Sequence, residues 1–198
     1  MPILTPLRAL LLWLFCALVA GRLATLADWP VLAHVLLVLL LGVAALSIYR
    51  RAAGLKRQID GLDLRWLVAP HLLRFAGIYF VQLGYRGIWP EPLAFPAGAG
   101  GAVTAAFAVA LLFLRLDSGP GRRLLTIWNV VGLVDILLTL VNLVRWLPEG
   151  SNGLQALTTL PLSLWPTFLA PLLLATHLII FMRLGGGRKG PPEILPSP

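Results

Sequence analysis

The chain has 198 residues, of which 59% are hydrophobic and 12% charged, and its formal net charge is +8. A mean hydropathy of +0.87 lies far outside the range of soluble domains, so the composition predicts an integral membrane protein without a separate soluble domain. The single cysteine, Cys16, excludes an internal disulfide and any metal or redox site built on paired thiols.

Six apolar segments follow one another, each close to the length that crosses roughly 30 Å of hydrocarbon. The expected spans are 7–26, 31–49, 66–84, 100–116, 124–143 and 158–184. We therefore expect an all-α bundle of six transmembrane helices within one domain, residues 1–184, and a flexible cytoplasmic tail over 185–198. The first segment resembles a signal peptide, but its apolar run restarts beyond Arg22, so we expect it to be retained.

The basic residues set the expected orientation, because short cytoplasmic loops accumulate lysine and arginine. If the spans alternate, most of them fall on one side: Arg8, Arg50, Arg51, Lys56, Arg57, Arg65, Arg115, Arg122, Arg123, Arg183, Arg188 and Lys189. Both termini are then cytoplasmic, and we expect a multi-pass protein of a bacterial inner membrane. The same charges predict attraction to anionic lipids, whereas no nucleic-acid partner is expected.

Tryptophans mark the proposed edges of the membrane. Trp29, Trp89 and Trp146 lie at the expected outer ends and Trp66 at an inner one, as an interfacial aromatic belt requires. Each outer connection also places a proline close to its tryptophan. This repetition suggests that the bundle consists of three in-out-in helical hairpins.

Five polar residues interrupt three of the apolar segments. His71 and Arg74 lie in the third, Asn129 and Asp135 in the fifth, and His177 in the sixth. With a rise of about 1.5 Å per residue, all five fall in the cytoplasmic half of the membrane or near its midplane. Because such groups are costly in hydrocarbon, we expect them to line a site or a pathway, or to form a buried ion pair.

Three interpretations of these five residues stay open. Helical spacing joins His71 to Arg74 and Asn129 to Asp135, and Arg74 is the first candidate partner for Asp135, so the set could be a structural ion pair. His71 and His177 could instead hold haem b in an electron-transfer protein. The preferred hypothesis is a small-ligand or proton-binding site in a transport-type module or subunit.

Two proline-rich segments predict irregular backbone. One is 90–101, and the other is the last span, where Pro161, Pro166 and Pro171 should kink or break the outer half. Irregular backbone is tolerated at membrane depth when it is buried in protein or lines a cavity. We therefore expect a ligand cavity near these segments.

Familiar catalytic and cofactor motifs are missing from the sequence. There is no HExxH, no GxSxG and no phosphate-binding Gly-Lys loop, and neither lysine lies in a span. The missing motifs disfavour an enzyme without excluding one, and we predict no metal site and no cofactor apart from the haem alternative. A structural or accessory subunit of a membrane complex, or a homo-oligomer, is a further alternative.

The last two thirds of the chain resemble a widespread family of small bacterial polytopic membrane proteins of unassigned function. The resemblance rests on Arg74-x-x-Gly77, Pro96-Ala-Gly-Ala-Gly100, Trp128-Asn-x-x-Gly-x-x-Asp135 and a proline-rich helix that ends in His177. It selects Arg74, Asn129, Asp135 and His177 and leaves His71 without support. This chain departs from the pattern at Gly101, where the family has aspartate, so any shared activity is in doubt.

Overall fold

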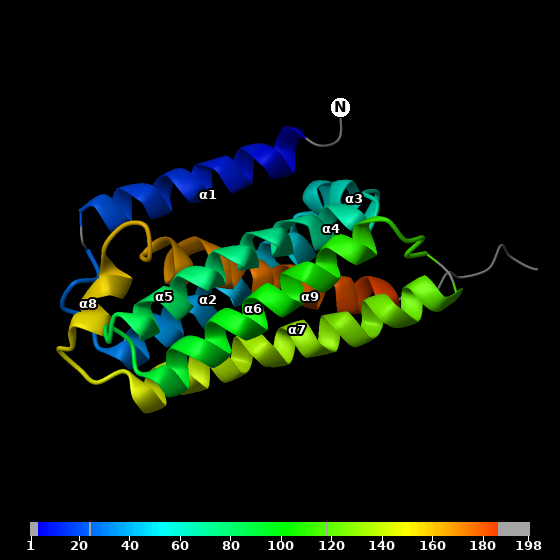
Figure 1. Ribbon diagram of the computed structural model, residues 1–198. Coiled ribbons are helices and arrows are strands. Elements are labelled where there is room, and N and C mark those ends of the chain that lie inside the picture. Colours follow the sequence, from blue (N-terminus) through cyan, green and yellow to red (C-terminus); the bar gives the residue numbers. More distant parts are fainter. Residues whose placement is uncertain (1–3, 24, 118, 186–198) are drawn as a thin grey trace, which may run out of the picture.

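The computed structural model describes residues 4–23, 25–117 and 119–185, which form helices and connecting turns and contain no strand. Long helices run along a common axis, and short helices lie at both ends (Figure 1). In chain order they are α1 Leu4–Arg22, α2 Val31–Arg51, α3 Ala53–Asp60, α4 Arg65–Val68, η1 Ala69–Gly77, α5 Ile78–Tyr85, α6 Glu91–Leu112, α7 Gly119–Trp146, α8 Asn152–Thr158, η2 Trp165–Leu169 and α9 Ala170–Gly185. Arg188, Lys189 and the rest of the expected tail beyond Gly185 lie outside the described residues.

Five helical segments are long and apolar enough to cross a membrane. They are Val31–Arg51, Arg65–Tyr85, Glu91–Leu112, Gly119–Trp146 and Trp165–Gly185. Their outward faces carry large exposed apolar side chains, as expected of helices that meet lipid. The first expected span corresponds to α1, which is not one of these five.

The helix α6 lies at the centre of the packing. It contacts η1, α5 and α7, while α2 and α7 both pack on α9. The helix α1 lies along one side of this bundle, mainly against η2 and α3 (Figure 1). Trp13 fastens it there, because the indole Nε1 donates to the carbonyl oxygen of Thr167 at 2.9 Å and the ring packs edge-on against Phe168.

The prediction of irregular backbone over 90–101 is wrong, because α6 already begins at Glu91 and is helical throughout. Pro92 lies in the first turn, where a backbone N–H has no helical partner to lose. Pro96 removes one further hydrogen bond, which the well-buried helix tolerates. The prediction for the last span is confirmed, since its outer part consists of turns and the π-helix η2 before α9 becomes regular at Ala170.

Trp89 is a core residue rather than a member of an interfacial belt. Its side chain is 1% exposed and stacks on Phe80 with ring centroids 4.8 Å apart. Its Nε1 donates to the carbonyl oxygen of Gly153 at 3.1 Å. A tryptophan between two helices has a sequence pattern similar to one at the lipid surface, so the sequence alone misplaced it.

One end of the bundle collects basic side chains, and we call it the basic end. It includes Arg50, Lys56, Arg65, Arg115, Arg122 and Arg183, contributed by α2, α3, α4, the α6–α7 connection, α7 and α9. Arginines join the elements here by donating to backbone carbonyls. Arg65 reaches the carbonyl of Leu114 at 2.8 Å, and Arg183 reaches that of Leu62 at 2.8 Å. Such contacts satisfy carbonyl groups that helix ends and turns leave without partners.

Candidate functional site

Arg74 owes its position to an unusual stretch of backbone. The segment η1 is a 3-10 helix of nine residues, far longer than is common for this structure. In a 3-10 helix, residues three apart lie directly above one another. His71, Arg74 and Gly77 have this spacing, and they are the buried residues of η1. The 3-10 winding therefore turns all three toward the interior of the bundle.

The Arg74 guanidinium connects three helical segments. Its Nη2 forms an ion pair with the Asp135 carboxylate on α7, which is the partner predicted from the sequence. Its Nη1 donates to the carbonyl oxygen of Gly132 at 3.1 Å and lies 3.4 Å from Nε2 of His177 on α9. The arginine is thus held by one charged and two neutral groups.

His177 is held in one tautomer by Asn129. The Nδ2 of Asn129 donates to the backbone carbonyl of His177 at 3.0 Å, so the amide oxygen faces the imidazole and can only accept. The Nδ1 of His177 lies 2.7 Å from this oxygen and must carry the proton. In the neutral ring Nε2 is then an acceptor, which suits its position beside the Arg74 guanidinium.

His71 also belongs to the group, although the family resemblance did not select it. Its ring centroid lies 4.2 Å from that of His177, and its Nε2 lies 3.0 Å from the hydroxyl oxygen of Thr176. The Trp128 ring packs against both imidazoles and donates from Nε1 to the carbonyl oxygen of Thr104 at 2.9 Å. The Nδ1 of His71 has no hydrogen-bond partner among the described residues.

Two glycines make room for these side chains. A Cβ on Gly132 would lie 2.6 Å from Cε1 of His177 and 3.1 Å from Cγ2 of Thr104. A Cβ on Gly100 would collide with Oδ1 of Asp135. Gly132 therefore permits a close approach between helices, and the group that approaches it is the His177 imidazole.

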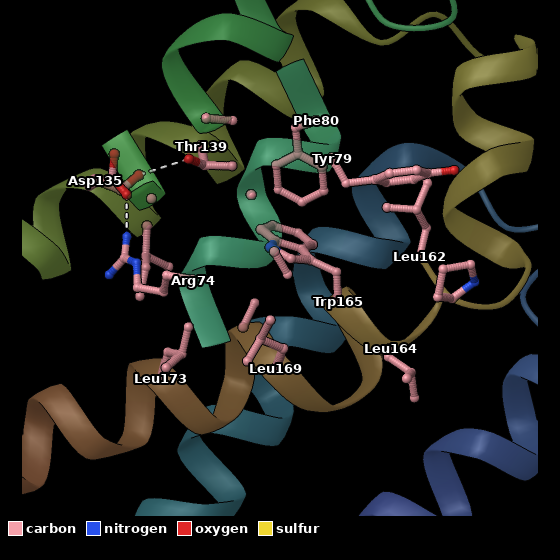
Figure 2. Close-up of a pocket in the computed structure, with 17 residues that line it drawn as sticks. Arg74, Tyr79, Phe80, Asp135, Thr139, Leu162, Leu164, Trp165, Leu169 and Leu173 are labelled. Atoms are coloured by element: carbon pink, nitrogen blue, oxygen red, sulfur yellow. Dashed lines mark hydrogen bonds and ion pairs between the residues drawn. The ribbon is translucent and has the colours of Figure 1, made fainter. Parts of the chain in front are cut away.

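A cavity of about 260 Å³ adjoins one side of this group. Figure 2 shows Arg74 and Asp135 together at one end of it, with Phe80, Trp165 and Tyr79 farther along. Its remaining walls are largely aliphatic, and η1 and the π-helix η2 both contribute to them. Two interruptions of regular helix therefore border one apolar cavity that has an ion pair at its end.

The five predicted residues lie together but divide into two parts. The side chain of Asp135 is 20% exposed, and Arg74 and Asp135 line the cavity, so we call this pair the cavity-facing half. His71, Asn129 and His177 are completely buried and do not line the cavity, and we call them the sealed half. The hydrogen bond between Arg74 and His177 joins the two halves.

Sequence reasoning missed the residues that complete both halves. Thr176 contacts His71 of the sealed half, Thr104 accepts from the Trp128 indole that packs against both imidazoles, and Trp165 and Phe80 line the cavity. The threonines offered a signal, since each is a lone hydroxyl in a largely apolar helix. The cavity residues offered none, because apolar residues that line a cavity look like any other core residues in a sequence.

The geometry does not fit haem between His71 and His177. A macrocycle bound by both imidazoles has to lie between them, and rings whose centroids are 4.2 Å apart leave no space for it. Both ring nitrogens of His177 already have protein partners. Within residues 4–23, 25–117 and 119–185, no three His, Cys, Asp or Glu side chains come together as a metal site would require.

Comparison with known proteins assigns the chain to a protein family. No curated protein and no solved structure matches it. A family model described as a domain of unknown function, DUF8737, matches residues 29–185, a range that includes both halves of the site and the cavity but not α1. This match agrees with the predicted membership of a family of unassigned function, whereas the bacterial source and the motif pattern stay predictions. The chain therefore belongs to the DUF8737 family.

Proposed function

We propose that this chain is a polytopic membrane protein that binds a small ligand or a proton at the cavity-facing half of the polar group. The proposal rests on the position of Asp135, an ionisable side chain that is partly exposed on the wall of a largely apolar cavity. Ionisable residues at membrane depth usually mark sites or pathways for ligands, ions or protons. The protein would serve as a transport-type module or as a subunit of one.

The charge of the site indicates the kind of ligand. Arg74 and Asp135 neutralise each other, and no other charged side chain in the described part of the chain lines the cavity. A ligand with a net charge would be desolvated there without a counter-ion, which is costly. We therefore expect the ligand to be an uncharged molecule with an apolar body and one hydrogen-bonding end. The alternative is a proton, which Asp135 would take up when its ion pair with Arg74 opens.

We further propose six spans, with α1 as the first and both termini in the cytoplasm of a bacterial cell. The α1 helix has 19 residues and an outer face of exposed leucines, such as Leu11 and Leu12. Six alternating spans would put the basic end on the cytoplasmic side of an inner membrane, in contact with anionic lipids. The three-hairpin arrangement and association with other subunits or with a second copy belong to the same proposal.

The experiment compares purified wild-type protein with Asp135→Asn and with a control, Thr139→Val, whose hydroxyl also lines the cavity but bonds its own helix. Native mass spectrometry detects small molecules that copurify, and infrared difference spectra across a pH series detect a protonated carboxyl group. We expect wild type and Thr139→Val to retain a bound molecule or a titrating carboxyl, and folded Asp135→Asn to lose it. If neither signal occurs in the folded wild type, the proposal is wrong.

A structural role is the second candidate, and the joining of three helical segments by Arg74 favours it. In that case Arg74 and Asp135 would matter for stability alone. A double-mutant cycle with Arg74→Ala and Asp135→Ala measures their coupling free energy. Strong coupling together with unchanged ligand retention in Asp135→Asn would favour an accessory subunit whose ion pair holds helices together.

A further inference from the structure

A second cavity lies at the basic end, separate from the polar group. Its volume is about 400 Å³, and it lies where the last turns of α2 and α9 meet α3. The lining residues are Tyr49, Arg50, Lys56, Asp60, Met182 and Arg183. Three of these six side chains are cationic and one is a carboxylate, so the cavity has an excess of positive charge.

The one carboxylate is already occupied by a local network. The Tyr49 hydroxyl donates to Oδ1 of Asp60 at 2.5 Å, and Lys56 forms an ion pair with Oδ2. The hydrogen bond to Asp60 raises the pKa of Lys56. Burial opposes ionisation of Asp60, but its hydrogen bonds with Lys56 and Tyr49 prevail and lower the pKa of the carboxyl group. Both groups are therefore charged near neutral pH and satisfy each other.

Two arginines that face this cavity have no such partner. Arg183 donates from Nη2 to the carbonyl oxygen of Leu62 at 2.8 Å, but its Nη1 is buried and has no hydrogen-bond partner among the described residues. Arg50 is exposed and forms no ion pair within the same residues. Neither arginine has a carboxylate within ion-pair distance among the described residues, so their charges favour an anion in the cavity.

We propose that this cavity binds a phosphate group between Arg183 and Arg50. The planar guanidinium matches the oxygens of phosphate, and charge-assisted bonds of this kind are among the strongest hydrogen bonds in proteins. Tyr49 and Lys56, which both bind Asp60, line the same cavity. The phosphate can be the headgroup of an anionic phospholipid or a free phosphate. The end of a transmembrane bundle is where lipid headgroups lie, and this inference does not depend on the cavity beside Asp135.

The test measures phosphate binding by the full chain in lipid nanodiscs and in detergent. The lipid probe is phosphatidylglycerol against phosphatidylcholine, followed as adducts in native mass spectrometry, and the free probe is inorganic phosphate, followed by thermal stabilisation in detergent. The variants are Arg50→Gln and Arg183→Gln. Arg51→Gln is the matched control, because it removes the same charge from the next residue, which does not line the cavity.

We expect Arg50→Gln to weaken phosphate binding about tenfold, the loss of one charge-assisted hydrogen bond, and Arg51→Gln to change it little. Arg50 has no hydrogen bond to lose among the described residues, so Arg50→Gln keeps the test valid even if Arg183→Gln unfolds. Phosphatidylglycerol adducts without stabilisation by inorganic phosphate would identify a lipid site, and the reverse would identify a free phosphate. Equal losses of phosphate binding in Arg50→Gln and Arg51→Gln, or no loss of phosphate binding in either variant, would overturn the proposal.

Discussion

The sealed half and the cavity-facing half of the polar group share η1 and α7 but differ in how their polar atoms are satisfied. Asn129 and His177 form two hydrogen bonds with each other, and both residues are completely buried. Asp135 lies six residues farther along α7, pairs with Arg74 and borders a cavity. The first arrangement is closed to solvent, whereas the second borders a cavity in which, under our proposal, a ligand or a proton engages Asp135.

This difference teaches that polar residues at similar depth in a bundle need not share a role. The sealed half fixes the tautomer of His177, and the tautomer presents an acceptor to Arg74. Arg74 is thereby aimed at the cavity, where Asp135 meets it. The sealed half therefore acts as the support for the cavity-facing half, and substitutions in the two should have different consequences.

The largest loss of stability is expected from Asn129→Leu. It leaves the Nδ1–H of His177 without a partner in a dry interior and removes the side-chain bond to the His177 carbonyl, which α9 continues to satisfy, at a cost of about 3 kcal/mol of unfolding free energy. Reversible unfolding in mixed micelles measures the change. The control is Asn142→Leu on the same helix, a partly exposed residue for which no side-chain hydrogen bond occurs in the described part of the chain. A similar small loss for both variants would remove the distinction between the halves.

Gly132→Ala should cause the next largest loss of stability. The new methyl group would lie 2.6 Å from the His177 ring, which Asn129 holds in place, so the helices must separate at a cost of about 2 kcal/mol. The same unfolding measurement applies, with Gly185→Ala as the control, because a Cβ there meets no described residue within 4 Å. A stable Gly132→Ala protein would show that the sealed half is looser than described.

Asp135→Asn should lower the unfolding free energy less than Asn129→Leu does, but we expect it to have the larger effect on ligand or proton binding. The substitution removes the counter-ion of Arg74, but the amide oxygen can still accept from Arg74, which keeps the Gly132 carbonyl and His177 and borders the cavity, so we expect a loss of about 2 kcal/mol, at the low end for a broken buried ion pair. Retention of the bound molecule or proton should nevertheless disappear. The halves would not differ as described if Asp135→Asn destabilised the protein more than Asn129→Leu.

The smallest effect is expected from Thr139→Val. The Thr139 hydroxyl donates to the carbonyl oxygen of Asp135 on its own helix at 2.9 Å, and a bond of this kind adds little to helix stability. We expect a change within about 0.5 kcal/mol in the unfolding free energy and unaltered ligand retention. A large loss of retention would mean that the hydroxyl contacts the ligand directly.

The polar group itself could be predicted from the sequence, because charged and amide side chains stand out in apolar segments. The pairing of Arg74 with Asp135 followed from the cost of leaving either alone. The division into halves could not be predicted, since it depends on the 3-10 winding of η1 and on the π-helix η2, which bring the cavity to one side. The start of α6 at Glu91 was missed because prolines in a first turn look like those of a loop.

The most direct test of the central claim is cysteine accessibility. The single native cysteine allows a Cys16→Ser background, into which Thr139→Cys at the cavity and Thr104→Cys, at a buried residue that does not line the cavity, are introduced separately. Each folded variant is treated with a small methanethiosulfonate reagent, and the rate of modification is measured. Our account predicts that Thr139→Cys reacts about tenfold faster or more, because thiol reactivity requires access. Equal rates at the two positions would contradict it.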